Sequence, residues 1–243
     1  MNNLIRRKLE KFSIKAKERG IYYSIRVAIR KIQDWITPII QLYLYKILGP
    51  KTFVFQGRTY SYFYNTYNGT WKNERVIEVP IIWQIVKHCV GKKILEVGNV
   101  LSHYFPVDHD ILDKYEKAND VINQDVVDFS PPKKYDLIIS ISTLEHVGWD
   151  ETPKEPYRVL RAIDNLKNLL TSNGRIVVTI PVGYNAELDR LLRNGAIDFS
   201  EMYCLKRTSP YNNWVETGGN ALCQVKYDFS IPSANAVVIL VFR

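Results

Sequence analysis

The second half of the chain alternates short apolar segments with amphipathic stretches. Residues 156–170 carry apolar side chains at helical spacing, between the third and fourth of the apolar segments. Five segments have the length and the Ile, Val and Leu content of buried strands: residues 94–97, 120–123, 136–141, 175–180 and 236–242. Such alternation predicts an α/β fold, a Rossmann-like, doubly wound and mostly parallel sheet with helices on both faces.

The two ends of this domain depart from the parallel pattern. Residues 221–229 and 236–242 are joined by too few residues for a crossover helix, which predicts an antiparallel C-terminal hairpin. Near the start, residues 53–63 indicate an aromatic hairpin that turns at Gln56-Gly57. A helix follows, with Pro80 expected in its first turn.

An N-terminal arm, residues 1–50, precedes the domain at 51–243. Apolar positions recur at helical spacing over residues 21–36, which predicts an amphipathic helix. Thr37-Pro38 is expected to cap and open a second apolar helical segment, residues 39–48. No apolar run approaches the roughly 20 residues that span a bilayer.

The positive charge of the protein is concentrated in the N-terminal arm. The 243 residues are 46% hydrophobic and 24% charged, which is typical of a globular protein. Eleven Lys and Arg against three Asp and Glu in residues 1–50 account for the whole net charge of +8. A basic arm on a neutral body favours an anionic membrane surface as partner and disfavours nucleic acid. The alternative is an arm that packs on the domain or on a second copy, giving a homo-oligomer.

Cysteine usage bears on the compartment. The three cysteines are widely separated, and no secretory signal precedes the domain, which predicts reduced thiols in a cytoplasmic protein, with peripheral membrane association through the arm.

Gly98 directly follows the first strand of the predicted sheet, where a glycine lets the backbone turn close to a ligand. Three later stretches accompany it in order, and together they resemble the class I S-adenosylmethionine-dependent methyltransferases, small-molecule enzymes of the methyltransferase type 11 kind, over residues 75–243. The four stretches that carry this resemblance are residues 94–99, 121–126, 135–147 and 169–181.

The resemblance implies S-adenosyl-L-methionine as cofactor and assigns residues to its parts. Its methionine end is expected at Glu96, Gly98 and Asn99, its ribose at Asp113, and its adenine at Asp125 and Val126, with Leu144 beneath the sugar or ring. Asp108 or Asp110 are alternatives for the ribose. The loop carries a single glycine, and Gly98→Val is expected to block the ligand's space without unfolding the sheet.

The same resemblance places the chemistry at the end of the family's fourth strand, which corresponds here to residues 135–141. His146 is the candidate general base, together with Glu145, for methyl transfer to a hydroxyl of a small molecule or saccharide. Residues 181–220 would be an insertion on the acceptor side, and residues 51–74 the aromatic hairpin and its loop. Arg75 and Glu78, one helical turn apart, predict a surface ion pair.

Other functions are weighed against this one. A non-catalytic methyltransferase-like module, used for membrane association or assembly, is the alternative, because the later glycines of the loop are missing. A nicotinamide-dependent oxidoreductase is disfavoured by the same loop. No metal is expected: His103, Asp108, His109 and Asp110 lack the ligand pair at i and i+4 of a zinc-protease site.

Overall fold

The computed structural model describes residues 21–218, 225–228 and 233–243. The chain forms two compact units that divide after Leu48. The second unit, Gly49–Arg243, contains the sheet and the candidate site.

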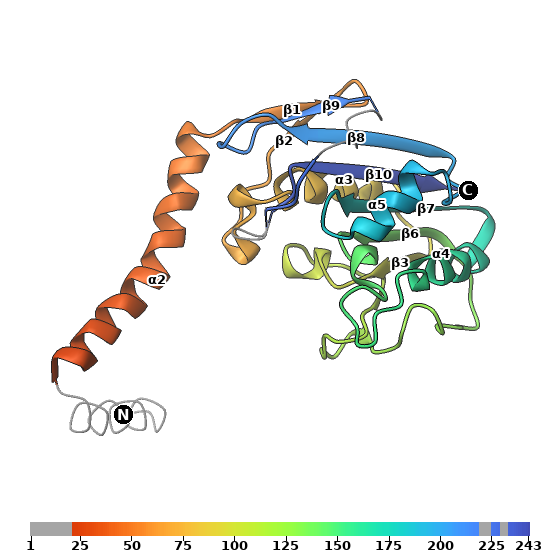
Figure 1. Cartoon of the computed structure of the whole chain (residues 1–243), viewed down its shortest axis with the longest axis horizontal. Helices are drawn as coiled ribbons and strands as arrows, with labels where there is room; N and C mark the ends of the chain where they lie inside the picture. Colours follow the sequence, from red (N-terminus) through yellow and green to blue (C-terminus); the bar gives the residue numbers. More distant parts are fainter. Residues whose placement is uncertain (1–20, 219–224, 229–232) are drawn as a thin grey trace. The chain divides into compact units, whose positions relative to one another are not determined.

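An eight-stranded mixed sheet forms the centre of this unit (Figure 1). Its first five strands run parallel, β10 is antiparallel to both of its neighbours, and β8 and β9 pair as an antiparallel hairpin. The predicted mostly parallel sheet with an antiparallel C-terminal end is therefore confirmed. In spatial order the strands are β5 (Val121–Ile122), β4 (Asp110–Leu112), β3 (Ile94–Val97), β6 (Tyr135–Ile141), β7 (Leu170–Pro181), β10 (Ala236–Phe242), β8 (Glu201–Arg207) and β9 (Trp214–Thr217).

The strand order reverses between β3 and β6. The chain proceeds from β3 outward to β4 and β5, then returns to the other side of β3 and continues through β6 and β7. In open α/β sheets, ligands bind in the crevice at the carboxyl ends of the strands where such a reversal occurs. The topology therefore favours a site at the ends of β3 and β6.

Alternating side chains of the strands serve two separate cores. Ile138 of β6 packs with helices α4 (Arg158–Asn168) and α5 (Ala186–Arg193), whereas Leu137 and Ile139 pack with helix α3 (Arg75–Lys87) and the hairpin. Both faces of the sheet are thus covered by helices, as predicted, and this explains why the strands read as continuous apolar runs.

The aromatic hairpin is also confirmed. Strands β1 (Thr52–Phe55) and β2 (Arg58–Ser61) pair antiparallel across Gln56 and Gly57, whose φ values are 51° and 69°. Two positive φ values in succession suit the right-handed twist of a two-residue hairpin. The hairpin brings Phe53 and Phe55 into the core that α3 shares.

The expected place of Pro80 is wrong. Helix α3 begins at Arg75, so Pro80 lies in its second turn rather than its first. A proline there cannot donate to the carbonyl of Val76. The backbone N–H of Phe63 donates to that carbonyl instead, at 2.9 Å, so the helix continues without an unpaired carbonyl.

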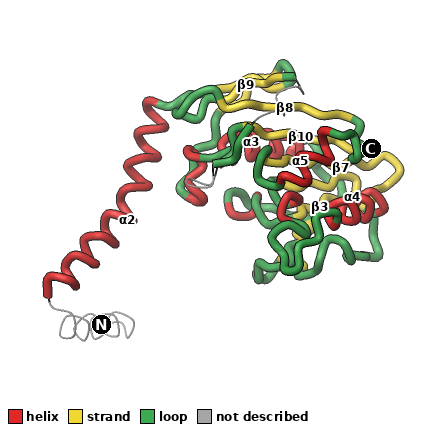
Figure 2. The backbone as a smooth tube through the Cα atoms, in the orientation of Figure 1, coloured by secondary structure: helices red, strands yellow, loops and turns green. Residues whose placement is uncertain are grey.

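The expected helix start at Thr37-Pro38 is also wrong. Helix α2 (Ile21–Leu48) runs through Pro38 as one element (Figure 2). Within the described part of the chain, no helix has both the length and the apolar character to cross a membrane. Several apolar side chains in the C-terminal half of α2 are exposed, namely Ile36, Ile40, Tyr43, Leu44 and Ile47.

The segments between the strands differ from the sequence-based expectation in two places. The predicted strand at residues 221–229 lies mostly outside the described residues, and its described part forms a single bridge between Asp228 and Ser233. Part of the expected insertion at residues 181–220 belongs to the sheet itself, as β8 and β9. The described residues of this unit also contain the 3-10 helices η1 (Tyr67–Lys72), η2 (Leu101–His103) and η3 (Leu144–His146).

Candidate functional site

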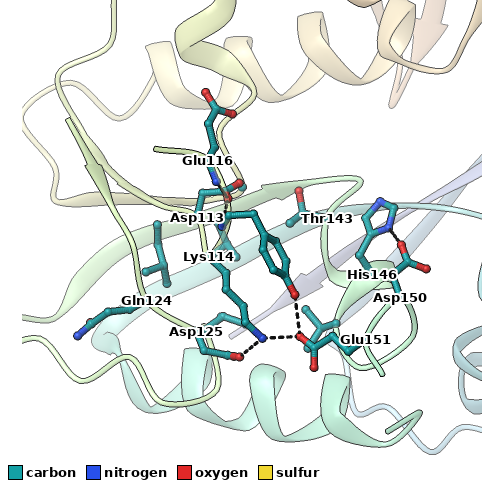
Figure 3. A pocket seen from close by; sticks show the side chains of 15 residues that line it. Asp113, Lys114, Glu116, Gln124, Asp125, Thr143, His146, Asp150 and Glu151 are labelled. Carbon is teal, nitrogen blue, oxygen red and sulfur yellow. Dashed lines mark hydrogen bonds and ion pairs between the residues drawn. The ribbon is translucent and has the colours of Figure 1, made fainter. Parts of the chain in front are cut away.

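A cavity of about 750 Å³ lies at the carboxyl ends of β3, β4, β5 and β6, where the strand order reverses (Figure 3). Its size suits a ligand of the nucleoside class. Five of the predicted site residues line it: Gly98, Asp113, Asp125, Val126 and His146. The other lining residues are Val97, Leu112, Lys114, Tyr115, Glu116, Gln124, Thr143, Val147, Asp150 and Glu151.

Gly98 takes a conformation that favours glycine. Its φ is +86°, and its N–H donates to the carbonyl of Leu112 at 2.8 Å, which ties the end of β3 to the end of β4. A Cβ at this position would meet Oγ1 of Thr143 at 2.2 Å. The side chain added by Gly98→Val would therefore strain the backbone and collide with Thr143, in addition to entering the cavity that Gly98 lines.

Asp113 follows β4, and its carboxylate lies between the loop after β3 and the loop after β4. Its Oδ1 accepts the N–H groups of Tyr115 and Glu116, each at 2.8 Å, and Oδ2 accepts that of Asn99 at 3.3 Å. Because the contact between Oδ2 and the N–H of Asn99 is long, Oδ2 can still accept a hydrogen bond from a ligand hydroxyl. Asp110 begins β4 at its opposite end, where it binds Lys133 and Tyr135, so it does not line this cavity.

Asp125 forms ion pairs with two cationic side chains. Its Oδ2 lies 2.8 Å from Lys114 Nζ and 2.9 Å from Nη2 of the Arg158 guanidinium, and its Oδ1 accepts the N–H of Val127. Burial acts to raise the pKa of Asp125, but the bonds from Lys114, Val127 and Arg158 outweigh it and lower the pKa. The carboxylate is consequently ionised at the edge of the cavity.

Lys114 joins two sides of the cavity. Its Nζ also lies 2.6 Å from Glu151 Oε1, and Tyr115 donates its hydroxyl to the same oxygen at 3.2 Å (Figure 3). The loop after β4 is thereby connected to the segment after η3. These contacts hold the rim of the cavity in place.

Glu96 is fully buried and faces away from the cavity. Its Oε1 accepts the N–H groups of Val100 and Leu101 at 2.9 and 2.8 Å, and its Oε2 lies 2.8 Å from His109 Nε2. The carboxylate therefore holds the loop after Gly98 in shape. Asn99, Leu144 and Glu145 are likewise not among the lining side chains, and Asn99 binds Glu116 at 2.7 Å.

His146 ends η3 and lies between two carboxyl groups. Its Nδ1 is 2.5 Å from Asp150 Oδ2, an oxygen that also accepts the hydroxyl of Tyr184 at 2.7 Å. Its Nε2 is 3.6 Å from Glu145 Oε1. Asn185 fixes this turn, since its side-chain amide donates to the carbonyl of Glu145 while its oxygen caps α5.

The ion pair of Arg75 and Glu78 is buried, not at the surface as expected. Glu78 is fully buried and lies 2.9 Å from Arg75 Nη1, which also donates to the carbonyl of Ile141 at 3.0 Å. Ser142 donates its hydroxyl to the other oxygen of Glu78 at 2.6 Å. The pair therefore joins α3 to the end of β6, beside the candidate site.

The cavity is acidic. Asp113, Glu116, Asp125, Asp150 and Glu151 line it against one lysine, Lys114. Apolar walls from Val97, Leu112 and Val126 lie beneath these groups. Such a lining suits a ligand with an aromatic base and a positive charge, and is unfavourable for a pyrophosphate.

Sequence reasoning missed Lys114, Asp150 and Glu151. Asp150 stands four residues after His146, a spacing that could have indicated a pair on one turn. The contacts of Lys114 and Glu151 cross between distant loops and leave no local pattern. Among the described residues, no group of His, Cys, Asp and Glu converges in a way that could hold a metal ion.

No protein-family profile matches the chain, and comparison of its sequence with curated proteins finds no match. Solved structures do resemble it. A 1,6-didemethyltoxoflavin-N1-methyltransferase from Burkholderia thailandensis is 10% identical, with 79% of this chain and 98% of that chain covered and a TM-score of 0.41. A possible histamine N-methyltransferase from Thermotoga maritima is 16% identical, with 66% and 87% covered and a TM-score of 0.39. The N-methyltransferase NodS from Bradyrhizobium japonicum, in complex with S-adenosyl-L-homocysteine, is 13% identical, with 66% and 84% covered and a TM-score of 0.37.

Proposed function

We propose that this protein catalyses S-adenosylmethionine-dependent methyl transfer to a hydroxyl of a small molecule or saccharide. The observation that carries the proposal is an acidic cavity of nucleoside size at the reversal of strand order, with a histidine on its wall. The sequence motifs at the ends of β3, β5, β6 and β7 support the same function by their resemblance to that enzyme superfamily.

The lining of the cavity fits the parts of this cofactor. Asp113 offers an oxygen to the ribose hydroxyls, and Val126 with Leu112 offers apolar faces to the adenine beside Asp125. The carboxylates of the rim suit the positive charge of the sulfonium and of the amino group. A pyrophosphate would instead need the N-terminus of a helix, and β3 is followed by a 3-10 helix of three residues.

When bound, the cofactor supplies a methyl group on a sulfonium, which an acceptor oxygen takes by in-line displacement. His146 receives the proton of the acceptor hydroxyl on Nε2. Asp150 holds Nδ1 and thereby keeps the other ring nitrogen free of a proton before the reaction. Glu145, whose Oε1 lies 3.6 Å from Nε2, is the second candidate catalytic residue beside His146.

Binding of S-adenosylmethionine and S-adenosylhomocysteine, measured by isothermal titration calorimetry, tests the proposal. Asp113→Asn removes the charge that faces the ribose and should weaken both ligands roughly 10- to 100-fold, the effect of a charge-assisted hydrogen bond. Asp120→Asn, at an exposed position, is the matched control. The absence of saturable binding at millimolar ligand, or binding of NAD with equal affinity, would refute the proposal.

A second candidate function rests on α2. Ile36, Ile40, Leu44 and Ile47 are exposed at helical spacing on this helix, next to the basic residues of the arm. Apolar side chains with neighbouring Lys and Arg suit the surface of an anionic membrane. We propose that the arm brings the domain to such a membrane. A non-catalytic module that uses the arm for membrane association or assembly would show this binding without the cofactor.

A further inference from the structure

A second cavity, of about 420 Å³, lies at the opposite edge of the sheet from the candidate site. Its wall includes Ile94, Asp110 and Tyr135, the first residues of β3, β4 and β6, and it adjoins the last turn of α3. The candidate site lies at the carboxyl ends of the same strands. We call the second cavity the basic cavity, after the lysines that line it: Lys87, Lys92, Lys93 and Lys133.

The charges of the basic cavity are opposite to those of the candidate site. Four lysines line it against two aspartates. Lys133 Nζ lies 2.6 Å from Asp110 Oδ2, so these two charges offset each other. The other aspartate, Asp108, is exposed. In the part of the chain that the structure describes, no ion pair occupies the three remaining lysines, which are Lys87, Lys92 and Lys93.

Two neighbouring groups oppose an anion in this cavity. Hydrogen bonds from the N–H of Lys93 at 2.9 Å and from Thr171 at 3.0 Å lower the pKa of Asp136, and the charges of Lys92 and Lys93 add to this. Three ammonium groups against two carboxylates still leave one positive charge. The end of α3 contributes roughly half a negative charge, and the N–H groups that follow the helix already bind the carbonyls of residues 84–86. The cavity therefore stays positive.

The inner wall of the basic cavity is apolar and preformed. Val86, Ile94 and Tyr135 line it with buried side chains. The ring of Trp83, also in the wall, stacks on that of Phe105, with centroids 4.2 Å and planes 3° apart. This contact fixes the position of the indole. A cavity of such size, with apolar walls and a few charged groups, is typical of a small-molecule site.

We propose that the basic cavity binds a phosphate monoester with an aromatic or other apolar body. A phosphate of this kind carries a charge of about −1.5 to −2 at pH 7 and three terminal oxygens, which match the three ammonium groups without ion-pair partners. Lysine binds phosphate as a point charge, so the match does not require one fixed side-chain geometry. The apolar body lies against the wall of Trp83, Val86 and Ile94.

The same ligand does not suit the candidate site. Five carboxylates line that cavity against one lysine, so a phosphate would be repelled there. The two edges of the sheet thus select ligands of opposite charge. The binding of a phosphate monoester in the basic cavity does not rest on the proposed methyl transfer.

Phenyl phosphate is the probe, and isothermal titration calorimetry measures its binding to the full chain. It should bind saturably at millimolar concentration, and added sodium chloride should weaken the binding. Inorganic phosphate, which lacks the ring, should bind at least about tenfold more weakly, because the apolar contact is lost. Phenol, which lacks the charge, should show no saturable binding in the same range.

A pair of variants tests the lysines. Lys87→Gln/Lys92→Gln removes two ammonium groups at exposed positions and should weaken phenyl phosphate binding roughly tenfold. Lys117→Gln/Lys206→Gln removes the same charge at exposed positions that line neither cavity and is the matched control. Equal losses in the two variants would show that the probe responds to the net charge of the protein, which overturns the proposal.

Cys89 lines the basic cavity and locates the bound probe. Phenyl phosphate should slow the alkylation of Cys89 by N-ethylmaleimide, measured by mass spectrometry of its peptide, with the saturation found by calorimetry. The proposal is overturned if this rate does not change, if phenyl phosphate does not bind saturably, or if inorganic phosphate or phenol binds as tightly. Binding of S-adenosylhomocysteine is measured separately, so failure of the methyltransferase proposal alone leaves these results intact.

Discussion

His146 Nδ1 and Asp150 Oδ2 lie 2.5 Å apart, one turn from each other at the end of the fourth parallel strand. The carboxylate determines which ring nitrogen carries the proton of the neutral imidazole. In this orientation Nε2 is the nitrogen left to accept a proton.

Asp150→Ala should therefore change the tautomer of His146. In the wild-type protein the neutral ring should carry its proton on Nδ1, and in the variant the Nε2–H form, usual for exposed histidines, should increase. Nitrogen-15 NMR of labelled histidine measures the two forms. The chain has four histidines, so His146→Asn suffices to assign the signal. An unchanged tautomer ratio would contradict the role of Asp150.

Substitution at Gly98 should cost more than substitution at another left-handed glycine. Gly98 and Gly57 both have positive φ, but a Cβ at Gly57 has no atom within 4 Å. Gly57→Ala should cost about 1–2 kcal/mol of unfolding free energy from backbone strain alone. Gly98→Ala should add about 1–3 kcal/mol from the collision with Thr143. Urea denaturation measures both.

A second variant separates strain from collision at Gly98. Thr143→Ala removes Oγ1 and Cγ2, the atoms that a Cβ would meet at 2.2 and 2.9 Å. Gly98→Ala should therefore cost less in the Thr143→Ala background than in the wild type. Equal costs in the two backgrounds would show that the side chain of Thr143 is not what excludes a larger residue.

Asp189 should make stability depend on pH. Burial raises its pKa to about 6, although the N–H of Gly183 and the charge of Arg193 oppose this. The unfolded chain releases the same proton at about pH 3.9. Between these values the folded protein binds more protons, so its stability falls as pH rises through this window.

Asp189→Asn should remove this component of the pH dependence. The variant should gain stability over the wild type as pH rises from 4 to 7, by at most about 3 kcal/mol. Thermal unfolding across this range measures the difference. Asp120→Asn, at an exposed position, should follow the wild-type curve. A constant difference between variant and wild type would show that Asp189 does not titrate in this window.

The exposed apolar side chains of α2 should contribute to vesicle binding. Full-length protein should sediment with phosphatidylserine vesicles, and added salt should release part of it. Ile40→Ser/Leu44→Ser should weaken binding at least about tenfold, because burying each such side chain contributes about 1.5–3 kcal/mol. Gln33→Ser/Thr37→Ser, at exposed polar positions on the same face of the helix, changes neither the charge nor the large apolar side chains and is the control. Equal losses in the two variants, or no sedimentation of the wild type, would contradict insertion.

The sequence alone determined the fold class, a mostly parallel sheet covered by helices on both faces. Runs such as residues 136–141 and 236–242 are apolar on both faces, and only strands covered on two sides require this. The same runs indicated which residues follow a strand. Gly98 and His146 could therefore be placed at the carboxyl edge without any knowledge of their partners.

Only the tertiary structure decided which side chains meet. Pro80 is accommodated inside α3 because Phe63, from the hairpin, supplies the missing donor to Val76. Glu96 turned out to bind His109 rather than line the cavity. Periodicity along a chain reports how each element faces its own core, but these contacts join elements that become neighbours only when the sheet assembles. For the same reason, the hydrogen bond from Arg75 to the carbonyl of Ile141, which joins α3 to the end of β6, left no trace in the local sequence.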